Sequence, residues 1–209
     1  MNKKIFLGTV IVVIVIAVFG VLEFIGFTPI TASEESAADD RIVVSKVPEY
    51  YAEEFGTWAS KVNTMLSEPF DDPRLKEAKY DIGFEYYLKA QEALKEFPYP
   101  LIPLGDDIHN DYNNLVLLSG YINHYQFART GHLGPNGEAK EATELADQWK
   151  PADANMHQAF KFLKQMVNDL DIAFNHKGEG KVFGVTYLLS GEKVSQIDEL
   201  MKGNYSEAN

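Results

Sequence analysis

The chain has 209 residues, of which 45% are hydrophobic and 24% charged. This composition is typical of a folded globular protein of one domain or two small ones. It has 31 acidic and 19 basic side chains, and the resulting formal charge of −12 would repel phosphate backbones, so no nucleic-acid partner is expected. The absence of cysteine excludes disulfides, thiolate metal sites, cysteine nucleophiles and lipid anchors on cysteine.

The first 27 residues are apolar enough to form a membrane anchor. Lys3 and Lys4 precede an uncharged run of 18 residues, 5–22, and about 20 apolar residues suffice to cross the hydrocarbon layer. Because basic residues flanking such a segment stay on the cytoplasmic side, the N-terminus is expected in the cytoplasm. The sequence therefore predicts a single transmembrane helix within residues 1–27, in the cell membrane, with the C-terminal domain extracytoplasmic.

A cleaved signal peptide is the alternative for this segment. Signal peptides have apolar regions of about 7–15 residues and small residues before the cut. A cut after Ala32 places Ile30 at the −3 position, whereas a cut after Ala38 places Ser36 there but lies far downstream. Whether the anchor is cleaved stays open, and both alternatives carry the rest of the chain across the membrane.

Residues 28–47 resemble a flexible linker in composition, because the stretch 33–40 is small, polar and acidic. Without the three charges of the first segment, the exported part has 17 basic and 30 acidic side chains, a formal charge of −13. Such a part would be repelled by anionic lipid headgroups.

Residues 48–209 show the periodicity of amphipathic helices. The expected fold class is all-α, an antiparallel bundle of five or six helices. Asp72, Asp106 or Asp107, and Ser190 are the expected caps at helix starts, and Gly203 is expected to close the last helix. The apolar stripes predict helices over residues 48–66, 73–97, 108–126, 139–149, 156–174 and 191–201.

The segment 181–189 is ambiguous. Its β-branched and aromatic residues favour a strand, while its leucines fit either state. One short two-stranded element is therefore an option there.

Two histidines lie one helical turn from an aspartate, in the pairs Asp106–His109 and Asp153–His157. Bundle proteins with two metal ions use Glu-x-x-His pairs on facing helices together with further glutamates, and this chain lacks that set. Both aspartates also lie where helices begin, the usual position of a cap. A metal site would require these four side chains to converge within about 5 Å, given metal–ligand bonds of ~2 Å.

Other catalytic patterns are weak. The carboxylate pairs of the chain are typical of solvated faces and caps, and the acidic cluster 106–111 lacks the glycine and closing glutamate of a calcium loop. Nucleophile-elbow and phosphate-loop motifs are absent. No catalytic, cofactor-binding or metal residue is assigned, no cofactor is predicted, and a non-catalytic role is favoured over an enzyme.

Tyrosines are more numerous than one buried face of each helix requires. Tyrosine combines contact area with a hydroxyl group, which suits both the rim of a core and a binding surface. The nine tyrosines concerned are Tyr50, Tyr51, Tyr80, Tyr86, Tyr87, Tyr99, Tyr112, Tyr121 and Tyr125.

These features together predict a membrane-tethered, extracytoplasmic helical binding protein of the cell envelope, whose partner is another envelope protein or a surface polymer. Two alternatives stay open. One is a metal-binding bundle protein or enzyme that uses the two Asp/His pairs, and the other is an accessory subunit of a larger membrane complex.

Overall fold

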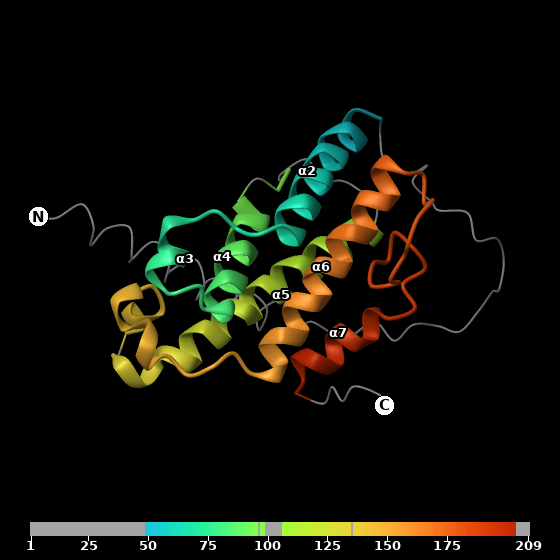
Figure 1. The fold of residues 1–209 in the computed structure, drawn as a ribbon. Coiled ribbons are helices and arrows are strands. Elements are labelled where there is room, and N and C mark those ends of the chain that lie inside the picture. Colours follow the sequence, from blue (N-terminus) through green and yellow to red (C-terminus); the bar gives the residue numbers. More distant parts are fainter. Residues whose placement is uncertain (1–48, 96, 99–105, 135, 204–209) are drawn as a thin grey trace, which may run out of the picture. The chain divides into compact units, whose positions relative to one another are not determined.

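A computed structural model describes residues 49–203, apart from 96, 99–105 and 135. This part is all-helical and is arranged as a helical bundle (Figure 1). Its long helices are α2 (Glu49–Ser67), α4 (Ile82–Lys95), α5 (Asp106–Thr130) and α6 (Ala154–Asn175). The shorter elements are α3 (Pro73–Glu77), α7 (Val194–Met201) and the 3₁₀ turns η2 (Gly131–Leu133), η3 (Glu138–Lys140) and η4 (Thr143–Gln148).

The predicted anchor at 1–27 and the predicted linker at 28–47 lie outside the described residues. Among the helices from residue 49 onward that the structure describes, none is both long and apolar enough to span a bilayer.

The helices α2 and α6 run antiparallel. Between α2 and α6, Asn63 Nδ2 donates to Asp171 Oδ2 at 2.9 Å, while Asn175 Nδ2 donates to the Gly56 carbonyl at 2.8 Å. Residue numbers therefore fall along α6 as they rise along α2. Figure 1 shows α2 and α6 side by side, with α7 against the early part of α6.

The helices α5 and α6 are antiparallel as well. Asn155, at the start of α6, donates from Nδ2 to the Tyr125 hydroxyl near the end of α5, at 3.0 Å. At the other end of this pair, Asp111 of α5 and Asp169 of α6 bind the same later segment of the chain.

The core lies where α6 meets α2, α4 and α5. The predicted stripe of α6 is confirmed, since Met156, Leu163 and Val167 are fully buried. Burying one such side chain contributes roughly 1.5–3 kcal/mol. On the other side of the core, Trp58 of α2 donates from Nε1 to the Ala93 carbonyl of α4 at 3.1 Å, so the indole is buried with its polar group satisfied.

The prediction of one helix over 73–97 is wrong, because the chain breaks between α3 and α4. Lys79 and Tyr80 have φ angles of 52° and 58°, in the left-handed region. The Tyr80 amide donates back to the Leu75 carbonyl at 2.8 Å, and Asp81 Oδ1 accepts from the Phe84 amide at 2.8 Å as the cap of α4. Asp72, in contrast, caps α3 as predicted.

The predicted helix over 139–149 is also wrong, since this stretch forms the 3₁₀ turns η3 and η4. Its backbone is used by another helix: Gln126 of α5 donates from Nε2 to the Lys140 carbonyl at 2.9 Å. The last helix begins later than predicted. Lys193 is its N-cap, and Ser190 has a φ of 58° and lies outside it. Gly203 closes that helix as predicted, with a φ of 71°.

Candidate functional site

The structure separates the histidines of the two Asp/His pairs. His109 lies at the start of α5, 16 residues before Tyr125, which meets the start of α6. At 1.5 Å per residue, this separation is about 24 Å along the helix axis. His157 lies at the start of α6, so the two histidines are at opposite ends of the α5–α6 pair and cannot bind one metal ion.

The aspartates of these pairs lie at helix starts. Asp153 caps α6 by accepting from the Met156 amide at 2.8 Å, as the sequence predicts for a helix-start aspartate. Asp106 begins α5, but its side chain lies outside what the structure describes. Among the described residues, no group of three or more His, Asp or Glu side chains is close enough to hold a metal ion.

His157 instead belongs to an aromatic group with Tyr86 and Phe160. The Tyr86 ring stacks on the Phe160 ring, with the two centroids 4.0 Å apart. The His157 ring contacts the Tyr86 ring edge-on, with the two centroids 5.3 Å apart. The Tyr86 hydroxyl lies 3.1 Å from His157 Nδ1, and burial is the main cause that raises the pKa of Tyr86. The phenol therefore stays protonated at neutral pH.

Other tyrosines also use their hydroxyl groups to hold helices together. Tyr121 donates to the Leu200 carbonyl of α7 at 3.0 Å, and Tyr87, which is fully buried, donates to Glu141. Burial raises the pKa of Tyr87. For these residues the structure favours the rim of the core over a binding surface, whereas Tyr80 is 68% exposed. The side chains of Tyr50, Tyr51 and Tyr99 lie outside the described part.

Arg129 is the centre of a buried polar node at the end of α5. Its Nη1 and Nη2 donate to the two carboxylate oxygens of Asp81 at 2.6 and 2.7 Å, and its Nε donates to the Lys150 carbonyl at 2.5 Å. The guanidinium also lies over the Trp149 ring, 5.6 Å from its centroid. The guanidinium of Arg129 therefore attaches two loops to α5, the one before α4 and the one before α6.

Lys89 is a second buried cation with a structural use. Its side chain is 4% exposed and forms an ion pair with Glu85 at 2.8 Å. Its Nζ also donates to the Glu68 carbonyl at 2.7 Å, just after α2. The lysine thus satisfies a carbonyl at the end of one helix from the side of another.

Two buried carboxylates hold the segment 181–189, a role that the sequence predicts for neither of them. Asp111 of α5 is 1% exposed and accepts from the amides of Tyr187 and Leu188 at 2.7 and 3.0 Å. Asp169 of α6 is 0% exposed and accepts from the amides of Phe183 and Val185 at 2.8 and 3.0 Å. This ambiguous segment is neither a helix nor a ladder of strands: its described bridges are isolated and centre on Thr186.

Burial dominates the electrostatics of both carboxylates. It raises the pKa of Asp111 to about 8, with the neighbouring carboxylates Asp107 and Asp169 adding to the rise. The two backbone N–H donors act in the opposite direction but do not offset the loss of water. Burial likewise raises the pKa of Asp169.

An open depression lies beside the contact of α2 with the end of α6. Its volume is about 550 Å³, in the range of small-ligand sites. The side chains of Thr57, Ser60 and Thr64 are exposed along it, and Gly56, Lys61 and Asn175 complete its lining. Hydroxyl and amide groups of this kind can exchange hydrogen bonds with a polar ligand.

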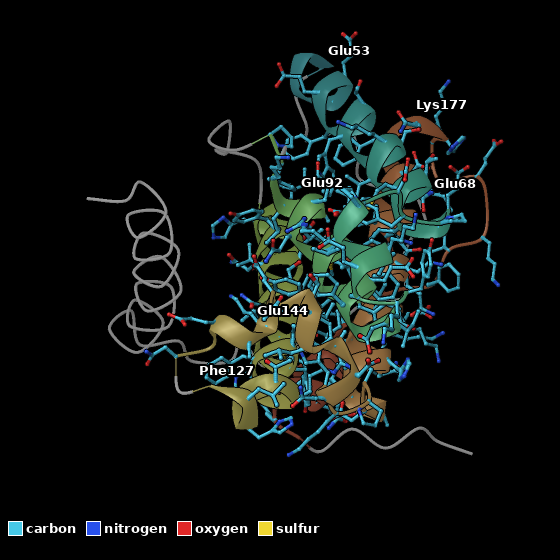
Figure 2. All side chains as sticks on the ribbon, turned by 60° about the vertical axis from the view of Figure 1, so that its left-hand side comes forward. Glu53, Glu68, Glu92, Phe127, Glu144 and Lys177 are labelled. Atoms are coloured by element: carbon cyan, nitrogen blue, oxygen red, sulfur yellow. The ribbon has the colours of Figure 1, made fainter. Side chains whose placement is uncertain are left out.

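Acidic side chains extend from the outer surface of the bundle at several places. Glu53 and Glu68 extend outward near the two ends of α2, and Glu144 extends outward from η4 (Figure 2). The same view shows Phe127 on the outer side of α5, where it is 42% exposed.

Comparisons of this chain with protein families, with curated proteins and with solved structures found no match.

Proposed function

We propose that the chain is a membrane-tethered, extracytoplasmic helical binding protein of the cell envelope, without catalytic activity. The observation that carries this proposal is the uncharged run of 18 residues, 5–22, directly after Lys3 and Lys4. A run of this length and flanking charge is what a single-pass anchor with a cytoplasmic N-terminus requires. The acidic stretch that follows would hold the helical domain away from anionic lipids.

A non-catalytic binding role is supported by the structural contacts of the buried ionisable groups. Asp111, Asp169, Lys89 and Arg129 are each engaged by backbone groups of the fold. General acid–base catalysis needs such a group within reach of a substrate, and these four contact the chain itself. Exposed hydroxyl groups of Thr57, Ser60 and Thr64, in contrast, line the depression beside α2.

The depression is the proposed contact for a polar partner, either a segment of another envelope protein or a surface polymer rich in hydroxyl groups. Its hydroxyls can both donate and accept hydrogen bonds, which suits polyhydroxylated or amide-rich partners. A recessed surface lined by several such groups offers more specific contact than a flat helix face.

Placement is tested first, with a full chain carrying a C-terminal tag in bacterial cells. Protease added to intact spheroplasts should remove the tag. In the control variant Val13→Arg/Ile16→Arg, insertion should fail and the tag should survive until lysis, because each arginine at the bilayer centre costs roughly 2.5–3.5 kcal/mol. Survival of the tag in the unmodified chain would refute the extracytoplasmic placement.

Binding is tested next by capture of partners from native membranes solubilised in mild detergent. We expect Ser60→Arg, which fills the depression with a long side chain, to abolish a captured partner. Ser195→Arg is the matched control, since Ser195 is exposed on α7. Equal capture by both variants would rule out the depression, and capture of the chain alone would remove support for a binding role. Capture through the anchor segment alone would favour the accessory-subunit alternative.

A further inference from the structure

The segment 181–189, called the strap below, is attached to the bundle mainly through its backbone. Asp111 and Asp169 together accept four of its amides, and Asn168 of α6 donates from Nδ2 to the Lys181 carbonyl at 2.9 Å. The strap in turn buries Val185, Leu188 and Leu189 in the core cluster. Releasing the four amides would therefore uncover apolar surface on α5 and α6.

Left-handed backbone positions flank the strap on both sides. Before it, Lys177 and Gly178 have φ angles of 51° and 81°. After it, Ser190 and Gly191 have φ angles of 58° and 64°. Non-glycine residues hold such angles at a cost of order 1 kcal/mol, so both ends are places where the chain can change direction when its contacts are lost.

The charged groups that act on the strap are mostly negative. Asp107 of α5 and Asp169 of α6 act on Asp111. Asp198 of α7 acts on the phenol of Tyr187, together with Asp111 and Asp107. On the strap itself, Lys181 holds its ammonium group 4.9 Å from the centroid of the Phe183 ring. Asp111 thus lies buried near the carboxylates Asp107 and Asp169. The backbone amides of the strap are its direct partners and the main partners of Asp169, which also bonds the Asn168 side chain.

We propose that the strap is a pH-controlled element, which is closed over the bundle in acid and opens as the pH rises through neutrality. In the closed state, Asp111 and Asp169 are buried beside other carboxylates, and a proton on either one removes a repulsion. In the open state, both carboxylates are hydrated and ionise at ordinary acidities. Closing of the strap therefore takes up protons. This proposal does not depend on which side of a membrane the helical domain lies.

The sign of the effect follows from the raised pKa of Asp111. A carboxyl group whose pKa is higher in the closed state stabilises closing fully below its open-state pKa, and this contribution is lost as the pH rises to its closed-state pKa. For Asp111 that window extends from its ordinary value up to about 8. Within it, the equilibrium constant for opening should rise by up to about tenfold per pH unit.

Amide hydrogen exchange of the full chain tests the proposal. Protection of the strap amides at Phe183, Val185, Tyr187 and Leu188 should fall by up to about 100-fold between pH 5.5 and 7.5, after correction for intrinsic exchange. Protection of the Leu163 amide, in the core part of α6, should stay constant over the same pH range. Constant protection of the strap would overturn the proposal, as would a parallel loss in α6, which would mean that the whole bundle opens.

Two further measurements isolate the carboxylates. The carboxyl carbon resonance of Asp111 should titrate above pH 6, and titration near pH 4 would contradict the proposal even if every variant failed to fold. Asp111→Asn should flatten the pH dependence of strap exchange. Asp171→Asn is the matched control, because Asp171 of α6 is also buried but accepts from the side chains of Asn63 and Asn175. In that variant, the pH dependence of strap exchange should be retained.

Discussion

The same substitution at two helical glycines should have opposite effects on stability. Gly120 lies in the middle of α5, and a Cβ built there meets nothing within 4 Å. Alanine is better than glycine in a helix interior by about 0.8–1.0 kcal/mol. Gly120→Ala should therefore raise the free energy of unfolding by nearly that amount.

Gly83 is different because Arg129 occupies the space beside it. A Cβ at Gly83 would lie 2.7 Å from Arg129 Nη1 and 3.2 Å from the Ala152 Cβ. To reach an ordinary separation of ~3.5 Å, the guanidinium must move by about 0.8 Å, although four hydrogen bonds hold it. Losing one such charged hydrogen bond costs about 1.5–3 kcal/mol. A smaller gain in helix propensity at this first turn offsets part of this cost, so the net destabilisation should be about 1–2 kcal/mol.

Thermal unfolding of the full chain in mild detergent, followed by circular dichroism, measures both effects. A chain of this size shifts its Tm by roughly 2–4 °C per kcal/mol, so the two variants should differ by about 4–12 °C, with Gly120→Ala the more stable. Equal stability of the two variants would refute the close packing of Arg129 against α4.

Three further predictions concern single contacts, at Lys89, Tyr121 and Asp153, and the same unfolding measurement checks each of them. Lys89→Met removes the donor to the Glu68 carbonyl and should cost about 1–3 kcal/mol. Tyr121→Phe removes the hydrogen bond to α7 and should cost about 1 kcal/mol, whereas Tyr80→Phe, at a largely exposed ring, should change stability by less than ~0.5 kcal/mol. Asp153→Ala should cost about 1 kcal/mol as a lost cap, and Asp153→Ser should restore most of it; a failure of serine to do so would argue against the capping role.

The long helices could be predicted from the sequence because their apolar stripes are local signals. The period of three to four residues needs no knowledge of the partner helix, and the α6 stripe from Met156 to Leu170 is buried as expected. Caps at Asp72 and Asp153 are equally local, since an aspartate bonds amides within three residues.

The break between α3 and α4 could not be predicted in this way. Lys79 and Tyr80 adopt left-handed angles without a glycine or proline to mark them. What favours the turn is distant in the sequence: Arg129 binds Asp81, which in turn caps α4. Tertiary contacts of this kind override local helix propensity.

The carboxylates that hold the strap were missed for the same reason. Asp169 stands in the apolar stripe of α6 two residues from Val167 and next to Leu170, an unusual position for a charge that could have marked it as buried. Its partners are backbone amides of another segment, and backbone groups leave no signature in residue identity. The metal-site alternative required the two Asp/His pairs to converge, and the antiparallel packing of α5 and α6 places His109 and His157 far apart instead.

The attachment of residues 183–188 through main-chain amides has a consequence for how this stretch can vary among related chains. Nearly any L-amino acid supplies the same N–H group, so substitutions at the positions of Phe183 and Tyr187 leave the anchoring contacts in place. Proline alone lacks that donor, and an inserted or deleted residue would move every amide out of register with its acceptor. At the positions of Phe183 and Tyr187, selection on the anchoring contacts would act on chain length and against proline, whereas Val185 and Leu188 are also constrained as core side chains.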